Sequence, residues 1–82
     1  MITKKLSELS PGERGIVCDV AAEPDVRDQW LELGIGVGEE ISMEGQSPFG
    51  DPIIVGLMNY RLSIRKRDAE NIVLRNVEQK FI

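Results

Sequence analysis

The feature that most constrains the fold is the stretch 26–52, which combines a short helical pattern, closely spaced glycines, a strand pattern and a loop rich in proline and glycine. Val26, Trp30 and Leu33 follow the spacing of one apolar helix face, and Leu31 widens that face. We therefore expect a helix of about two to three turns whose apolar stripe is buried, so that truncating Leu31 or Leu33 would strongly destabilise the domain.

Both ends of the predicted helix carry termination signals. Asp25 stands where an N-cap carboxylate would accept backbone N–H groups. Gly34 stands where a left-handed residue ends a helix, and Gly36 and Gly38 leave the backbone free to turn into a strand. The polar positions of the helix, Arg27 among them, are expected to face water.

Alternating residues predict strands on both sides of the helix. Before the helix, Ile16, Cys18 and Val20 share one face, which makes Cys18 a small inward-facing core residue. After the helix, Ile41 and Met43 are expected to face inward, opposite an acidic outer face.

The second half of the chain predicts two further strands, a helical turn and a last strand. Residues 53–58 are apolar on both faces, and Gly56 within them indicates a bend or bulge at a barrel corner. Residues 60–65 have one apolar and one basic face. Residues 66–71 suit a single helical turn before a last strand at 72–75, and the tail 76–82 is expected to be partly ordered.

Together these elements describe a mainly β protein. About five short strands, with one short helix between the first and second strands and a helical turn before the last, are typical of a small barrel. We expect residues 1–82 to form a single domain, because a chain this short buries only about 60% of its unfolded surface and has room for one core.

The residue types needed for catalysis or metal binding are scarce. Cys18 is the only cysteine and there is no histidine, so the chain lacks an internal disulfide and an ordinary transition-metal ligand set. The glycines of GIGVGEE follow a helix and enter a strand, the reverse of the order that directs backbone N–H groups at phosphate. We therefore expect no catalytic, cofactor-binding or metal-binding residues.

The charge of the chain is unevenly distributed. The net charge is −4, with 11 acids and 4 bases in residues 1–57 and 3 acids and 6 bases in residues 58–82, or −7 and +3. A negative total argues against general nucleic-acid binding, which needs clustered positive charge. The asymmetry either reflects a solvated surface or lets one side of the barrel meet an acidic partner.

The hydropathy of the chain predicts a cytoplasmic protein. The longest apolar run, residues 53–55, is far shorter than the roughly 18 to 20 residues that cross a bilayer. The N-terminus lacks the apolar region of a signal peptide. We therefore expect a cytosolic protein.

The loop 45–52 is the candidate surface for binding a partner. Its prolines constrain the path of the chain, and Phe49 at the tip either folds back over the core or is presented to a partner. We place the candidate surface on this loop together with the solvent face of the helix around Arg27, although that guanidinium could instead pair with a carboxylate of its own helix. The candidate residues are Arg27, Pro48, Phe49, Gly50 and Asp51.

Four segments read together resemble the FeoA family of bacterial ferrous iron transport accessory proteins: LSELSPGERGIV, LELGIGVGEEI, SPFGDPI and LSIRKRDAENIVL. The chain departs from the family pattern at Val37, where proline is common, and at Trp30, where leucine is usual. Arg27 matches an arginine often seen in the family's helix. The resemblance implies that the barrel is SH3-like.

The resemblance also implies a function. It implies a cytosolic accessory protein that acts on the FeoB-type membrane transporter, which carries a G-protein-like domain, without itself carrying iron or hydrolysing nucleotide. The alternative is an SH3-like regulatory module that binds a proline-rich segment, as in the barrel domains of iron-dependent repressors. Self-association remains open.

Overall fold

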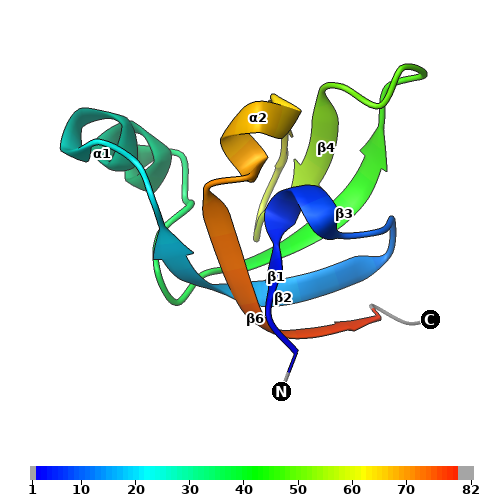
Figure 1. Cartoon of the computed structure of the whole chain (residues 1–82), viewed down its shortest axis with the longest axis horizontal. Helices are drawn as coiled ribbons and strands as arrows, with labels where there is room; N and C mark the ends of the chain where they lie inside the picture. The colour runs from blue at the N-terminus through cyan, green and yellow to red at the C-terminus, as the bar shows by residue number, and fades with distance from the viewer. Residues whose placement is uncertain (1, 80–82) are drawn as a thin grey trace.

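The structure is a computed structural model that describes residues 2–79. Six antiparallel strands form one curled sheet in the order β1-β6-β2-β3-β4-β5 (Figure 1). The strands are β1 (Lys4–Lys5), β2 (Glu13–Val20), β3 (Glu40–Gln46), β4 (Ile53–Gly56), β5 (Arg61–Ile64) and β6 (Ile72–Gln79). The helices are the 3₁₀ helix η1 (Leu6–Glu8), α1 (Pro24–Glu32) and α2 (Lys66–Ala69).

The predicted architecture is confirmed. Helix α1 separates the first two long strands, and α2 is the single turn before the last strand. The short β1 and η1 were not predicted, and β6 extends to Gln79 rather than ending at residue 75. Of the predicted tail, residues 80–82 lie outside the described part of the chain.

One apolar cluster fills the inside of the curled sheet. Residues from all the long strands contribute to it, together with η1, α2 and the segment after α1. Its members are Leu6, Leu9, Val17, Val20, Ile35, Ile41, Met43, Ile53, Val55, Ile64, Ala69, Ile72, Leu74 and Val77.

The predicted inward face of β2 is confirmed for Val20 and wrong for Ile16 and Cys18. Val17 is fully buried, whereas Cys18 and Ile16 are only half-buried. The pairing of β2 with β6 shifts register between Arg14 and Ile16 and again between Val17 and Asp19. Each shift interrupts the simple alternation of sides along the strand, so residues three apart, Val17 and Val20, both reach the core.

The bend or bulge predicted at Gly56 is not found there. It pairs directly with Ser42, and the register shift in this pair of strands lies in β3, between Met43 and Gly45. Ser42 is buried and its hydroxyl donates a hydrogen bond to Glu44 at 2.7 Å. A Cβ atom at Gly56 would lie 2.7 Å from Ser42 Oγ and 2.5 Å from Glu44 Oε2, so the glycine makes room for this pair.

The predicted burial of α1 is also wrong. The helix begins at Pro24 with Glu23 as its N-cap, so Asp25 lies in the first turn instead. No residue of α1 is buried, and Leu31 is 61% exposed. Only Trp30 of this helix packs partly against the core. The apolar stripe inferred from periodicity exists, but most of it faces solvent.

The glycine stop after α1 is confirmed. Gly34 has φ +96°, and its N–H bonds to the carbonyl of Leu31 at 2.9 Å. The N–H of Ile35 bonds to the carbonyl of Trp30 at 2.8 Å, which completes a Schellman motif. Because Ile35 is buried, this turn attaches the end of α1 to the core.

Candidate protein-interaction surfaces

The β3–β4 loop is held closed by its own hydrogen bonds. The hydroxyl of Ser47 donates to the carbonyl of Asp51 at 2.6 Å, and the N–H of Ser47 bonds to the carbonyl of Pro52 at 3.1 Å. The N–H of Gly50 bonds to the carbonyl of Ser47 at 2.8 Å, and Gly50 has φ +85°. Glycine adopts this conformation without steric cost, so the sequence suits the tight turn.

Phe49 lies at the tip of this closed loop and is 96% exposed. The interpretation that Phe49 folds over the core is therefore wrong. Since the loop is already ordered, presenting the phenyl ring to a partner would cost little conformational entropy.

Asp51 has a structural contact. Its Oδ1 accepts a hydrogen bond from the backbone N–H of Lys66 at 2.9 Å. This N–H lies in the first turn of α2, where it has no partner within the helix, so a residue distant in sequence acts as the cap. The carboxylate therefore joins the β3–β4 loop to α2.

Arg27 is exposed on α1 and forms no ion pair with another described residue. Pairing with Asp28 or Glu32, the structural alternative for this side chain, is not observed in the described part of the chain. Arg27 borders a cleft of about 290 Å³ between α1, the end of β2 and the segment after α1. The other lining residues are Asp19, Val20, Asp28, Leu31, Ile35, Gly36 and Val37.

Arg27 and the loop residues do not form one surface. Helix α1 lies at one side of the barrel, and the β3–β4 loop lies at the opposite side (Figure 1). The predicted site therefore consists of two separate surfaces, one on the loop tip and one on α1.

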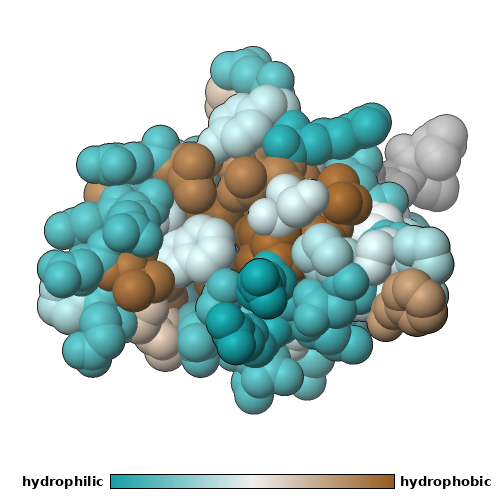
Figure 2. Space-filling model, turned by 90° about the horizontal axis from the view of Figure 1, so that it is seen from above, coloured by the Kyte–Doolittle hydropathy of each residue, from teal (hydrophilic) through white to brown (hydrophobic). Residues whose placement is uncertain are grey.

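Sequence reasoning missed the exposure of apolar residues on α1 and just after it. We define the α1 surface as the exposed residues Leu31 and Val37, which line one cleft with Arg27; Val26 and Leu33 are also exposed. Figure 2 shows a further apolar area at the centre of the upper face, between α1 and the β3–β4 loop, with hydrophilic residues around it. Exposed apolar clusters with polar rims are typical of protein-interaction sites. Periodicity identifies the apolar face of the helix, but it does not show that Leu31 on this face is 61% exposed.

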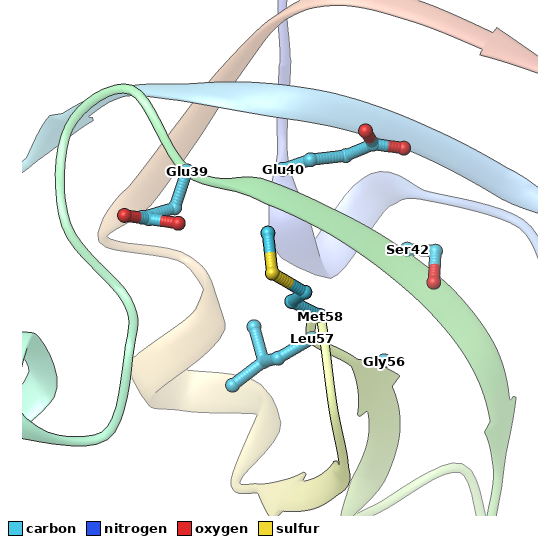
Figure 3. Close-up of a pocket in the computed structure, with 6 residues that line it drawn as sticks. All are labelled: Glu39, Glu40, Ser42, Gly56, Leu57 and Met58. Atoms are coloured by element: carbon cyan, nitrogen blue, oxygen red, sulfur yellow. The ribbon is translucent and has the colours of Figure 1, made fainter.

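A cleft of about 200 Å³ lies between the start of β3 and the β4–β5 turn (Figure 3). The carboxylates of Glu39 and Glu40 lie on the β3 side, and the side chains of Leu57 and Met58 come from the opposite side. Glu40 is paired with Arg14 at 3.2 Å. The lining residues include no histidine, cysteine or lysine that could act as a base or nucleophile beside these groups.

Residues 2–79 contain neither a cluster of metal ligands nor a membrane-spanning helix. No group of three or more His, Cys, Asp or Glu side chains is arranged to hold a metal ion in this part of the chain. None of its helices is long and apolar enough to cross a bilayer.

A protein-family model described as the FeoA domain matches residues 4–76. The chain belongs to the FeoA family. The solved FeoA protein of Chlorobium tepidum is 42% identical, with a TM-score of 0.79 over 87% of this chain and 69% of that one. The SH3-like barrel expected from the sequence is confirmed, and it is the fold of a FeoA domain.

Two other FeoA relatives carry functional descriptions of their own. FeoA of Stenotrophomonas maltophilia, solved with zinc, is described as an SH3 domain protein with a suggested activating role in ferrous iron transport; it is 28% identical, with a TM-score of 0.79 over 99% of this chain and all (100%) of that one. A fusion protein of Porphyromonas gingivalis joins an Fe²⁺ transport protein A to the transporter FeoB. It is 32% identical over 83% of this chain, which spans only 8% of its length.

Proposed function

We propose that this protein is a non-enzymatic accessory protein of bacterial ferrous iron uptake that binds a FeoB-type transporter from the cytosol. The observation that carries the proposal is the Porphyromonas gingivalis fusion, in which a related FeoA region and FeoB occupy one polypeptide. A covalent link keeps two modules at high local concentration, whereas separate proteins need a binding surface to achieve the same association.

Two surfaces are suited to that binding. The loop surface consists of Pro48, Phe49, Gly50 and Asp51, and it presents an exposed aromatic ring from a closed turn. Aromatic anchors of this kind contribute a large share of the binding energy in interfaces. The α1 surface adds exposed apolar residues beside the guanidinium of Arg27, which forms no ion pair within residues 2–79.

The residue types of the chain support a role by binding another protein rather than by catalysis. The only cysteine, Cys18, has no histidine to activate it, and the glycines after α1 enter a strand rather than a phosphate-binding helix. The protein is therefore proposed to change the behaviour of the transporter, with iron and nucleotide handled by the transporter itself.

Ferrous iron uptake in a strain lacking this gene tests the proposal. The wild-type gene should restore uptake of radioactive Fe²⁺, and Phe49→Ala or Arg27→Glu should restore less at equal protein level. Met58→Ala and Arg75→Glu are matched controls, because both side chains are exposed and lie outside the two surfaces. Full uptake in the deletion strain without any complementing gene would contradict a role in this transport system.

A further inference from the structure

Strand β5 forms an open edge of the sheet. It pairs only with β4 among the described strands. At the turn between them, the N–H of Leu57 bonds to the carbonyl of Tyr60 at 2.8 Å. Hydrogen-bonded pairs alternate with non-hydrogen-bonded pairs in an antiparallel ladder, so Arg61 and Ser63 occupy the non-hydrogen-bonded positions. Their N–H and C=O groups therefore point away from β4.

These outward backbone groups have no internal partner in the described chain. Apart from the ladder itself, no hydrogen bond of the described residues involves the backbone of Arg61 or Ser63. Both residues are exposed. An edge with unpaired donors and acceptors is the template to which another extended chain can add.

The same edge carries uncompensated positive charge. Residues 61–68 contain four bases and one acid, and the four bases are all exposed: Arg61, Arg65, Lys66 and Arg67. None of them forms an ion pair with a described residue. By contrast, Lys4 pairs with Glu13 at 3.2 Å, and Arg14 pairs with Glu40 at 3.2 Å and with Glu78 at 3.1 Å.

We infer that the open edge of β5 binds an extended acidic segment of another protein by β-strand addition. Its backbone would pair with Arg61 and Ser63, and its carboxylates would meet the flanking bases. This goes beyond the proposed function, because it rests on a third surface and on no assumption about the transporter.

The charges also argue against a second copy of this chain as the occupant. Antiparallel pairing of two β5 strands would bring the exposed bases of both copies close together. In the register centred on Ser63, Arg61 of each copy would lie directly opposite Arg65 of the other, where like charges are destabilising. A phosphate or an anionic membrane would contact the bases alone, leaving the outward backbone groups of the edge unused.

Amide NMR of the full chain with a defined peptide tests the inference. The probe is the capped peptide Ac-Thr-Glu-Val-Glu-Val-Glu-Thr-NH₂, with the same peptide carrying Lys in place of Glu as a charge control. Binding of the acidic peptide should shift the amide signals of Arg61 and Ser63 and slow their hydrogen exchange. The lysine peptide should leave both signals unchanged.

Two changes remove the backbone contact itself. Ser63→Pro removes one outward N–H without touching a bond to β4, and proline is tolerated on edge strands. Loss of one hydrogen bond should weaken binding about fivefold. Ser63→Ala, which keeps the N–H, should bind as the wild type does. Methylating alternate backbone nitrogens of the peptide removes its donors to the β5 edge and should also weaken binding. This test needs no protein variant, so it applies even if Ser63→Pro does not fold.

The inference is overturned if folded Ser63→Pro and the methylated peptide both bind with unchanged affinity. It is also overturned if the peptide shifts only the signals of Arg65, Lys66 and Arg67, leaving the exchange of Arg61 and Ser63 unaltered. The same holds if inorganic phosphate or phosphatidylglycerol vesicles bind while the acidic peptide does not, because the site would then recognise anions without the strand edge.

Discussion

The Asp51 carboxylate accepts a hydrogen bond from the backbone N–H of Lys66 at 2.9 Å, and so the β3–β4 loop caps helix α2. The loop that presents Phe49 is therefore attached at its base to the turn that leads into β6. Exposure of the phenyl ring and order of the loop are compatible, because the loop is fixed by Asp51 and Ser47 and not by burial of its tip.

Replacing Asp51 should destabilise the domain. Asp51→Ala removes the cap and should lower the free energy of unfolding by about 1 kcal/mol, the usual cost of losing a side-chain cap. Asp51→Asn keeps an acceptor oxygen and should cost less. Urea denaturation of both variants measures this, and equal midpoints for Asp51→Ala and the wild type would show that the contact contributes nothing.

Shortening the exposed Leu31 side chain on α1 should have little effect on stability. Leu31 is 61% exposed, so Leu31→Ala should change the free energy of unfolding by about 0.5 kcal/mol, as surface substitutions do. Ile41→Ala, at a fully buried position of β3, should cost about 2 to 5 kcal/mol. Thermal melts compare the two, and a similar loss in both would mean that α1 packs on the core in solution.

Phe49 should matter for binding and not for folding. Phe49→Ala should leave the melting temperature unchanged, because the ring is 96% exposed, and should weaken binding of the transporter by about 1 to 3 kcal/mol, as for an interface anchor. Met58→Ala is the control, since that side chain is also exposed. A lower melting temperature with unchanged binding would remove Phe49 from the proposed site.

The chain reveals some features of this fold because they depend on neighbouring residues alone. Gly34 ends α1 by local backbone conformation, and the alternation in β4 puts Ile53 and Val55 inside. Burial across the molecule follows no such local rule. Bulges reorient β2 and bury Val17, and the helical period places Leu31 on the apolar face of α1 without showing that this side chain is exposed. The separation of Arg27 from the loop likewise depends on the three-dimensional path of the sheet (Figure 1).

Acidic pH should remove the contribution of the Glu13 carboxylate to the stability of the fold. The backbone N–H of Ser10 donates a hydrogen bond to the Glu13 carboxylate at 2.8 Å, and Lys4 Nζ lies 3.2 Å from the same carboxylate. Both contacts hold the pKa of Glu13 below its usual value of 4.5. A carboxylate with a lowered pKa stabilises the fold above its unfolded pKa, and this contribution is lost as pH falls through the folded pKa.

Glu13→Gln therefore separates this contribution from the rest. The variant should be less stable than the wild type by about 1 kcal/mol near neutral pH, and the difference should shrink as pH falls below 4.5. Urea denaturation across that range measures the difference. A difference that does not change with pH would mean that the charge of Glu13 is unimportant.

Calorimetry of the purified protein with the cytosolic part of the FeoB-type transporter from the same organism tests the central claim most directly. The proposal predicts saturable one-to-one binding that Phe49→Ala and Arg27→Glu weaken and that Met58→Ala and Arg75→Glu leave unchanged. Titration with Fe²⁺ or GTP in place of the transporter should give no saturable heat. Absence of binding to the transporter, or tight binding of iron or nucleotide by this protein alone, would contradict the account.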